Sequence, residues 1–475
     1  MKQPQLNQFG STRRGTMRVL SLFCMTALAV CLSGVVNAGT VFVPMPVGDP
    51  ATDWENVQAA VDSAIDGDTV QFGPGAYVFG VDSDFIVVEV PEIRLVGHPL
   101  GTTIVGGEVM PILGEPGSPW LIGNNSLLQS PPRGFYLTAD EQRISNIRFE
   151  GFRTAILIGY GDFFETGGYV VEDCEFIETV YGVNAHVESD KVTAIRGNAF
   201  INSTFPYDLS GGRYHVSYNY LASPDPDKIP IDFTHHSGVL AAGGPFYDEG
   251  GAFVTEHNLL EFNIVNGGVT DGFEVIGDAG GLLRNNIFRN NEFYDMQGIA
   301  GLADVRSYGG DIVDSVFVNN NLDGSGGHGL LMLNFGGTFD GNLIVGNELT
   351  SVAGRSGVGV YIRGTTNTIF SDNVITGVEP GALYYGTRFY RGHSNQFLLN
   401  DTDADTAAWF SYSPEGLFAS DNSDDVAVDE YGDLVESLDP NQDFNRLLKC
   451  EEHLKDTESV EDFRECVDDA LEELH

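Results

Sequence analysis

Basic side chains are scarce in this chain. Only 24 of its 475 residues are Lys or Arg, against 68 Asp and Glu, so the formal net charge is −44. Four of the basic residues (Lys2, Arg13, Arg14 and Arg18) precede Gly39 and every acidic residue follows it, so the segment from Gly39 onward carries −48. A surface of this sign repels polyanions, which makes nucleic acid and anionic membrane poor partners. The acidity itself fits a solvated surface, and cation binding is the alternative.

Cysteine is scarce as well, with five residues in the chain. Cys24 and Cys31 lie in an apolar N-terminal run, and Cys174 lies in a strand-like segment where a buried thiol is expected. Cys450 and Cys466 remain. In an exported protein a disulfide between these two is permitted, and we expect it.

The first 38 residues have the pattern of an export signal. Three arginines precede an apolar run at 19–36, and Val36-Asn37-Ala38 offers a small-residue cleavage site before Gly39. We therefore expect residues 1–38 to be a signal peptide. The mature chain would be secreted, periplasmic or at the cell surface, with no membrane partner after cleavage. Met17 as the true start and an uncleaved anchor both stay open, because the run approaches the length that spans a bilayer.

Helical periodicity is lacking in the stretch 258–395, which repeats one short pattern about four times. Each repeat has an anchor, which is an Asn or Ser followed by branched or aromatic residues. The anchors are Asn286-Ile287-Phe288, Ser315-Val316-Phe317, Asn342-Leu343-Ile344 and Asn373-Val374-Ile375, spaced by 29, 27 and 31 residues. A β-type segment follows each anchor, at 302–306, 330–334, 358–363 and 383–388.

This period is that of a solenoid, in which small units stack to close a common core. A solenoid lengthens without thickening, so one long domain is expected rather than several globular ones. The abundance of glycine (59 residues) suits its many tight turns. The expected internal column is Phe288, Phe317, Ile344 and Ile375, with the amides of Asn286, Asn342 and Asn373 forming a ladder.

A helix and two strands are expected before the repeats. Apolar residues fall at helical spacing in 53–67, with Asp53 placed to cap the N-terminus and Gly67 to end the run. Strands at 69–72 and 76–79 follow. A helix at this position would cover the open end of the stack and block pairing between edges.

The run Val57–Ala64, then Gly67-Asp68-Thr69-Val70 and Pro74-Gly75-Ala76-Tyr77, resembles the N-terminal cap of the right-handed parallel β-helix proteins of the pectin-lyase-like superfamily. With the repeats, the resemblance covers residues 39–400. It implies an all-β fold, a right-handed parallel β-helix (solenoid) with an N-terminal helical cap. The superfamily holds polysaccharide lyases, glycoside hydrolases, epimerases, adhesins and tailspikes, so the fold leaves the function open. Residues 401–475 are expected to form an acidic segment with a small helical hairpin.

Between the cap and the repeats lie less regular rungs, with Phe149, Phe176 and Phe200 as candidate inward residues. The stretch 203–251 interrupts the rhythm, and we expect a long loop there that shapes a binding site. It contains His235-His236. Neighbouring side chains on an extended segment point to opposite faces, so surface histidines or a substrate contact are expected before a shared metal ion.

The residues best suited to chemistry lie on the strands that follow the anchors. Aligning Val275, Val305, Leu333 and Ile362 as inward residues places Glu274, Asp304, Met332 and Tyr361 in one outward column and Ile276, Arg306, Asn334 and Arg363 in the next, extended by Arg388. Successive rungs lie about 4.8 Å apart. Glu274 and Asp304 are therefore expected as neighbours that face solvent.

Two carboxylates this close raise the pKa of one of them, which keeps a general acid protonated near neutral pH. The arginines beside them would form an anion site suited to a uronate or a sulfate. The alternative is a ladder of solvated ion pairs across the rungs.

A second resemblance covers the same strands. Thr270-Asp271-Gly272-Phe273-Glu274, Asp304, Gly327-His328-Gly329 and Tyr361-Ile362-Arg363 are similar to the ordered motifs of polygalacturonase-type glycoside hydrolases. The resemblance implies that Asp271 and Asp304 are the acid and the water-activating carboxylate of an inverting hydrolase. It also implies that His328 orients them and that Arg363 binds the substrate carboxylate.

The sequence therefore predicts an exported β-helix protein that binds and cleaves an acidic, uronate-containing polysaccharide. A polysaccharide lyase is one alternative, with Arg306, Arg363, Arg388 and Tyr361 to remove the C5 proton and neutralise the carboxylate, and Ca²⁺ as a candidate cofactor. A non-catalytic glycan-binding or surface-structural solenoid is the other.

Overall fold

The computed structural model describes residues 38–107, 132–159, 163, 165–223, 236–242, 254–266, 271–278, 280–296, 300–325, 327–352, 358–377, 385–390, 396–398, 401–402, 406–411, 417–420, 426–428 and 434–435. For 236–242 and for the segments after residue 377, the description covers the backbone only. The expected signal peptide, the helical hairpin and the Cys450–Cys466 disulfide lie outside the described residues.

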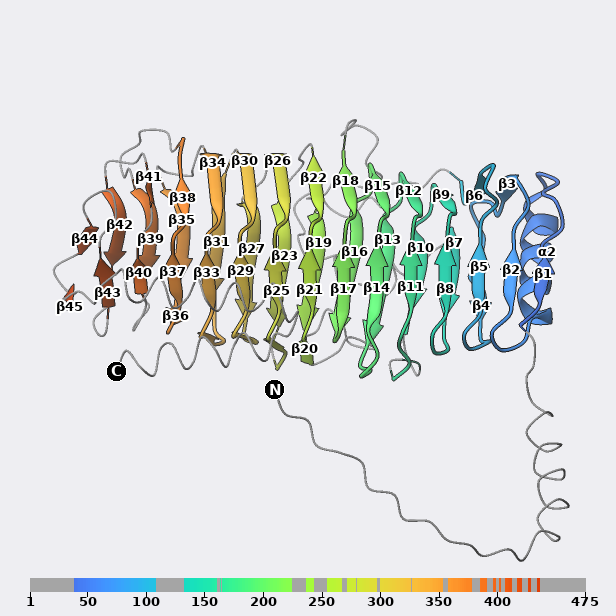
Figure 1. The fold of residues 1–475 in the computed structure, drawn as a ribbon, viewed down its shortest axis with the longest axis horizontal. Coiled ribbons are helices and arrows are strands. Elements are labelled where there is room, and N and C mark those ends of the chain that lie inside the picture. Colours follow the sequence, from blue (N-terminus) through green and yellow to red (C-terminus); the bar gives the residue numbers. More distant parts are fainter. Residues whose placement is uncertain are drawn as a thin grey trace, which may run out of the picture. The chain divides into compact units, whose positions relative to one another are not determined.

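From Thr40 onward the chain winds through three parallel sheets, A, B and C (Figure 1). From β2 to β42 each circuit adds one strand to each of these sheets in that order, beside the strand of the previous circuit. Sheet A consists of β1 (Thr40–Phe42), β2 (Thr69–Gln71), β5 (Arg94–Val96), β8 (Arg143–Ser145), β11 (Val170–Glu172), β14 (Thr193–Arg196), β17 (Tyr214–Ser217), β21 (Leu259–Glu261), β25 (Ile287–Arg289), β29 (Val316–Val318), β33 (Leu343–Val345), β37 (Ile369–Ser371), β40 (Gln396–Leu398), β43 (Leu417–Ser420) and β45 (Leu434–Val435).

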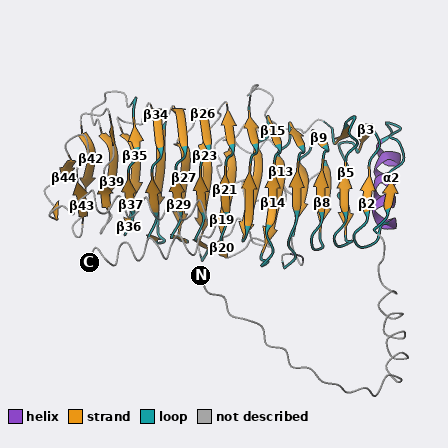
Figure 2. Cartoon of the chain, in the orientation of Figure 1, coloured by secondary structure: helices purple, strands orange, loops and turns teal. Residues whose placement is uncertain are grey.

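Sheet B follows sheet A within each circuit. It consists of β3 (Gly75–Val78), β6 (Thr102–Val105), β9 (Arg148–Glu150), β12 (Glu175–Ile177), β15 (Ala199–Ile201), β18 (Tyr220–Ala222), β22 (Ile264–Asn266), β26 (Glu292–Met296), β30 (Asn321–Ser325), β34 (Glu348–Val352), β38 (Val374–Ile375) and β41 (Asp401–Thr402). These strands are two to five residues long (Figure 2).

Sheet C closes the circuit and carries the longer strands. It consists of β4 (Ile86–Val88), β7 (Arg133–Leu137), β10 (Thr154–Ile158), β13 (Tyr181–Val187), β16 (Phe205–Gly211), β19 (His236–Ala242), β23 (Asp271–Asp278), β27 (Ala300–Tyr308), β31 (His328–Asn334), β35 (Val358–Arg363), β39 (Tyr385–Tyr390), β42 (Thr406–Ser411) and β44 (Val426–Val428). A small sheet D joins in the later circuits, with β20 (Val254–Glu256), β24 (Leu282–Arg284), β28 (Asp311–Val313), β32 (Phe339–Asp340) and β36 (Thr365–Thr366).

The helix α2 (Pro50–Ser63) packs on the first strands of the coil, as the expected cap does (Figure 1). Its bounds correct the sequence prediction. Asp49, not Asp53, is the N-cap, and its carboxylate accepts a hydrogen bond from the Thr52 amide at 3.0 Å. Pro50 occupies the first turn, where its missing N–H costs nothing. This helix is not long and apolar enough to span a membrane, and the described residues contain no helix that is.

Asp53 is buried, and it links three segments of the chain by hydrogen bonds instead of capping the helix. Its carboxylate accepts hydrogen bonds from the amides of Val47 at 2.8 Å, Gly48 at 3.0 Å and Val78 at 3.0 Å. Because β3 contributes Val78, one side chain joins the helix, the chain before it and the first strand of sheet B. The helix ends at Ser63 rather than at Gly67.

Columns of stacked side chains fill the interior. Phe149, Phe176 and Phe200 are buried, as expected, with ring centroids 5.2 and 4.7 Å apart along the stack. Phe288 stacks on Phe317 at 4.6 Å with rings 4° from parallel. Each ring buried in this way contributes about 1.5–3 kcal/mol relative to an exposed one.

The expected column is wrong at its last member. Phe288, Phe317 and Ile344 continue to Phe370, whereas Ile375 lies in sheet B beside Leu349. The anchor pattern occurs twice per circuit, once before sheet A and once before sheet B. The predicted column therefore combines residues of sheet A with Ile375, which belongs to the series before sheet B.

Two buried asparagine series mark these two turns. Before sheet B, each amide Nδ2 donates to the Oδ1 of the next asparagine at 2.9–3.0 Å, in the order Asn198, Asn219, Asn263, Asn291, Asn320, Asn347 and Asn373. Before sheet A, Asn258 donates to Asn286 at 2.9 Å, and the Ser315 amide donates to Asn342 at 3.1 Å. The ladder predicted from Asn286, Asn342 and Asn373 is thus two separate ladders.

The residue before each ladder position turns the chain with a positive φ. Asn285, Asn290 and Asn319 have φ of 54°, 53° and 51°. Asparagine tolerates this left-handed conformation because its short amide bonds locally. At Gly341 (φ 63°) glycine takes this conformation without the strain that a side chain would add.

Two expected boundaries differ from the structure. The stretch 203–251 does not interrupt the coil throughout, because β16, β17, β18 and β19 are regular members of the three sheets. The sheets also continue past residue 400, where the coil was expected to end, since β41 to β45 extend them to residue 435. Cys174 is a buried free thiol, as expected.

Candidate functional site

The outer face of sheet C brings the predicted chemical residues into register. Glu274 of β23 and Asp304 of β27 are direct partners, and so are Ile276 and Arg306. Strands pair at about 4.8 Å, which makes Glu274 and Asp304 neighbours across the two rungs. Their side chains point away from the core because Val275 and Val305, which alternate with them, belong to it.

The alignment is wrong by one residue at the next rung. Asp304 pairs with Leu331 rather than Met332, and Arg306 pairs with Leu333 rather than Asn334. Met332 belongs to the core. The register shifts between Ala300 and Ala303, so the strand spacing deduced from the repeats does not hold here.

The corrected columns separate the expected residues into two groups. One column runs Glu274, Asp304, Leu331, Tyr361 and Arg388, and the other runs Ile276, Arg306, Leu333, Arg363 and Tyr390. A leucine rung therefore lies between the acidic group and the group of Tyr361, Arg363 and Arg388. Arg388 follows Tyr361, not Arg363, and its position comes from its backbone.

The acidic group is buried, which corrects the expectation that it faces solvent. Glu274 is 5% exposed and Asp304 is 0% exposed. The pKa of the Glu274 carboxyl is raised to about 8, chiefly by burial and to a smaller extent by the charge of Asp304, while Arg306 opposes both. The main cause is thus burial rather than the like charge. At neutral pH, Glu274 carries a proton.

Asp304 is held by an arginine of its own strand. The Arg306 guanidinium donates from Nε to Asp304 Oδ1 at 2.7 Å, and its Nη2 pairs with Oδ2. Residues two apart on a strand share a face, so this fork is built within one strand. The result is a protonated carboxyl beside a carboxylate–guanidinium pair.

The second group joins an imidazole, a phenol and a guanidinium. His328 is buried at the start of β31, and its ring centroid lies 6.1 Å from that of Tyr361. The Arg363 guanidinium carbon lies 5.5 Å from the centroid of the Phe335 ring, which stabilises its charge. The structure thus places His328 beside Tyr361. Asp271 begins β23, and its side chain is outside the described part of the structure.

Sequence reasoning missed a polar set on earlier rungs of the same face. Asn184 Nδ2 donates to Asp208 Oδ2 at 3.0 Å, and His186 Nδ1 lies 2.6 Å from Ser210 Oγ. All four side chains are buried, and burial lowers the pKa of His186 to about 4. Asn184 pairs with Asp208, Asp208 pairs with Val239, and Val239 pairs with Glu274. These residues therefore occupy one column of sheet C.

A signal for this set was present in the sequence. Asn184 and His186 in β13, and Asp208 and Ser210 in β16, alternate with apolar residues at matching positions 24 residues apart. The repeats become regular only from residue 258, so a repeat pattern defined there does not include these earlier rungs.

No group of three or more His, Cys, Asp or Glu side chains suited to a metal ion occurs among the described residues. The residues that could touch an anion on sheet C are instead Arg306, Arg363 and, by its backbone position, Arg388.

Comparison with known proteins identifies the fold. Residues 231–402 match the family model described as a right handed beta helix region. With the parallel sheets, this match establishes a right-handed parallel β-helix and confirms the expected resemblance. A comparison with curated proteins gives no match.

Several solved structures are similar to the chain at low identity. A PL6 alginate lyase in complex with a trisaccharide is 11% identical, with 86% of this chain and 90% of that chain covered and a TM-score of 0.43. The family 28 exopolygalacturonase of Yersinia enterocolitica is 12% identical, with coverages of 84% and 79% and a TM-score of 0.37. The tailspike protein of E. coli bacteriophage HK620, in complex with a pentasaccharide, is 10% identical, with coverages of 79% and 78% and a TM-score of 0.45.

Proposed function

We propose that this right-handed parallel β-helix binds an acidic, uronate-containing polysaccharide on the outer face of sheet C and hydrolyses it there. The observation that carries the proposal is the carboxyl pair Glu274 and Asp304, paired across neighbouring strands, with the pKa of Glu274 raised to about 8. A carboxylic acid that keeps its proton at neutral pH can protonate a glycosidic oxygen as the bond breaks.

Glu274 is the proton donor in this proposal. Its proton goes to the oxygen that leaves the anomeric carbon, and the other carboxylate, Asp304, stabilises or attacks that carbon. The Arg306 fork fixes the orientation of Asp304. A water molecule then attacks the anomeric carbon, and one of its protons passes to the ionised Glu274, which completes the hydrolysis.

The spacing of the pair predicts the stereochemical course. Neighbouring strands of a parallel sheet lie about 4.8 Å apart, so two residues that pair directly across them start from that separation. Retaining glycosidases have carboxyls about 5–5.5 Å apart, and inverting enzymes have them about 6.5–9.5 Å apart. Retention is therefore expected, in contrast to the inverting course implied by the resemblance to polygalacturonase-type enzymes.

The anionic character of the substrate follows from the arginines. Basic residues number only 24 in the chain, yet Arg363 and Arg388 lie on adjacent strands of sheet C. Arg388 pairs with Tyr361, which lies two residues before Arg363 on its strand. Guanidinium groups bind carboxylates through two parallel hydrogen bonds. This group would hold a uronate carboxylate two or more rungs away from the Glu274 and Asp304 pair.

The second candidate is glycan binding without cleavage. It is favoured by the burial of Glu274 and Asp304, which leaves almost no surface of either carboxyl group open to a substrate. In that case the exposed parts of sheet C bind the polymer, and the buried pair is structural.

The test is turnover of polygalacturonate and alginate by the full chain and by Glu274→Gln and Asp304→Asn. Hydrolysis produces reducing ends without ultraviolet absorbance, whereas β-elimination adds the absorbance of a conjugated double bond. We expect reducing ends only, and a loss of about a hundredfold or more in kcat for each variant. Binding of the polymer with no product would favour the second candidate. Turnover that survives both substitutions would place the chemistry elsewhere.

The site lies on a chain for which export is also proposed. The expected signal peptide, residues 1–38, would deliver the protein to a compartment that contains extracellular polysaccharide. The test is the N-terminal sequence of the secreted protein, which should begin at Gly39.

A further inference from the structure

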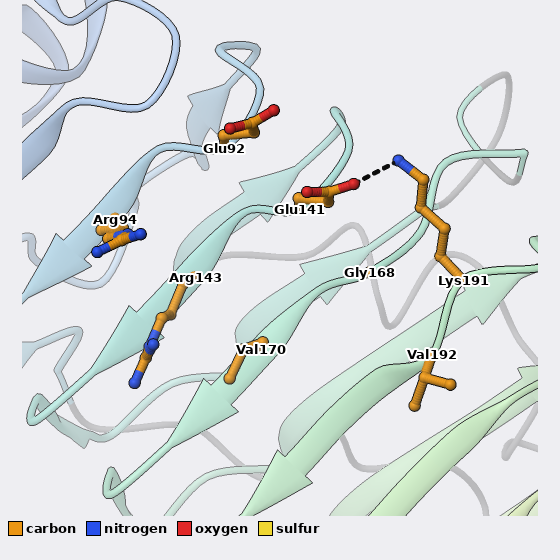
Figure 3. A pocket seen from close by; sticks show the side chains of 8 residues that line it. All are labelled: Glu92, Arg94, Glu141, Arg143, Gly168, Val170, Lys191 and Val192. Carbon is orange, nitrogen blue, oxygen red and sulfur yellow. Dashed lines mark hydrogen bonds and ion pairs between the residues drawn. The ribbon is translucent and has the colours of Figure 1, made fainter. Parts of the chain in front are cut away.

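A second charged site lies on the outer face of sheet A, a different sheet from the one that carries Glu274. It is a groove with a volume of about 490 Å³, formed by β5, β8, β11 and the turns that precede them (Figure 3). Its lining includes Glu92, Arg94, Glu141, Arg143, Val170 and Lys191.

Two arginines are paired across neighbouring strands in this groove. Arg94 and Arg143 are direct partners on neighbouring strands of sheet A. Like charges that face each other across two strands repel and destabilise the sheet. The pairing is unexpected in a chain with only 24 basic residues. The strain of the pair is relieved if an anion binds between them.

The neighbouring acid does not neutralise this pair. The Glu172 carboxylate is shared, because its Oε1 pairs with Arg143 and its Oε2 lies 2.8 Å from Arg196 Nη2. No ion pair joins Arg94 to any acidic side chain in the described part of the chain. Burial is the main cause that lowers the pKa of Arg143, and the nearby charges of Arg196 and Arg94 lower it further.

The other end of the groove is built differently. Lys191 Nζ lies 2.7 Å from Glu141 Oε1 and 3.1 Å from Asp140 Oδ2, so its charge is already compensated (Figure 3). Gly168 turns the chain beside these side chains with a φ of 78°, a left-handed conformation that favours glycine. Carboxylates here can accept hydrogen bonds from hydroxyl groups, and Val170 supplies an apolar surface between the two ends.

We propose that this groove binds one anionic sugar residue, a uronate or a sulfated sugar, as a non-catalytic site for the polysaccharide. The carboxylate or sulfate lies between Arg94 and Arg143, and Glu92 and Glu141 accept hydrogen bonds from ring hydroxyls. The volume falls in the range of about 300–1,000 Å³ typical of small-ligand sites. The identity of the polymer rests on the proposed function, whereas the anion site does not.

The experiment is calorimetric titration of the full chain carrying Glu274→Gln, which prevents turnover. The probes are trigalacturonate, a sulfated trisaccharide, a neutral trisaccharide of the same length and inorganic sulfate. Arg94→Gln is the principal variant, because Arg94 is exposed and its loss leaves the fold intact. Arg148→Gln is the matched control, an exposed arginine of sheet B whose nearest acids, Glu150 and Glu175, lie 3.2 and 3.7 Å away.

The expected result for trigalacturonate is two classes of saturable site, one in the groove and one on sheet C. Arg94→Gln should weaken the first by about tenfold or more and leave the second unchanged, and Arg148→Gln should change neither. Whichever charged trisaccharide binds tighter identifies the anion as carboxylate or sulfate. Equal binding of the neutral trisaccharide, or no change in Arg94→Gln, would overturn the proposal. If the protein cleaves no uronate polymer but Arg94 still governs sulfate binding, the groove stands as an anion site and the proposed hydrolysis fails.

Discussion

Glu274 and Asp304 are direct partners on two adjacent parallel strands, and both carboxyl groups are buried. One of them, Asp304, is paired with Arg306 of its own strand. The proton on Glu274 is therefore part of the folded structure, and several measurable properties depend on it.

Stability should fall with rising pH because of Glu274. Its pKa is raised to about 8 in the folded protein, while a free glutamate has a pKa of about 4.3. Between these values the folded chain keeps the proton and the unfolded chain has lost it, so the free energy of unfolding decreases as pH increases. The Glu274 contribution is on the order of 3–5 kcal/mol, complete above about pH 8.

Chemical denaturation of the wild type and of Glu274→Gln, from pH 5 to pH 9, measures this contribution. The variant should gain stability relative to the wild type as pH rises, since glutamine has no proton to lose. Other acidic groups affect both proteins equally and cancel in the difference. A difference that does not change with pH would mean that Glu274 titrates like an exposed carboxyl.

Removing Arg306 should destabilise the fold more than removing both members of its pair. Arg306→Ala leaves the Asp304 carboxylate buried without its partner, at a cost of about 3–5 kcal/mol. The double variant Asp304→Asn with Arg306→Ala should recover at least half of that loss. Arg148→Ala, which breaks an exposed pair with Glu150, serves as the control and should cost less than about 1 kcal/mol. Additive losses in a double-mutant cycle would show that the pair is not coupled.

Replacing an asparagine at the centre of the ladder before sheet B should destabilise the fold. Asn320 Nδ2 donates to Asn347 Oδ1 and to the Phe288 carbonyl, both at 2.9 Å, and its own Oδ1 accepts from Asn291. Asn320→Ala leaves these buried groups without partners, at about 1–3 kcal/mol for each that stays unsatisfied. Thermal unfolding should show a large drop in Tm. Asn266→Ala, an exposed asparagine with one long contact of 3.4 Å to Tyr220, should change Tm little, and equal effects of the two variants would contradict the ladder.

Replacing Asp49 and replacing Asp53 should reduce the free energy of unfolding by different amounts. Asp49→Ala removes the helix N-cap and should cost about 1 kcal/mol. Asp53→Ala removes a buried acceptor of three backbone amides and should cost clearly more, since those N–H groups lose their partner. Urea denaturation of the two variants ranks them. The opposite order would restore Asp53 as the cap, as the sequence predicted.

The repeat period was enough to predict the fold. Gly and Asn turns, apolar triplets and the lack of helical periodicity all indicated a stack of short parallel strands, and stacking is what such units require to bury their apolar residues. The pairing of Glu274 with Asp304, and of Ile276 with Arg306, was also predicted correctly, because β23 and β27 pair without a register shift from Phe273 to Asp278.

Register across an irregular rung could not be predicted. The shift between Ala300 and Ala303 moves Leu331 to the place expected for Met332, and a slip of one residue reverses which side chains face outward. Burial of Asp304 was missed for a related reason, since the sequence of a strand does not show what covers its outer face. The cap was misplaced because Asp49 and Asp53 both have the right chemistry, and only the position of Pro50 in the first turn separates them.

The most direct test of the account is the titration of Glu274 itself. The measurement is ¹³C NMR of the protein labelled at its glutamate side-chain carboxyls, from pH 4 to pH 10, with Glu274→Gln to assign the signal. We predict one resonance that titrates near pH 8, is absent from Glu274→Gln and shifts to a lower pKa in Asp304→Asn, where a repelling charge is lost. A Glu274 signal that titrates with the other glutamates below pH 6 would contradict the central claim that this carboxyl is a proton donor at neutral pH.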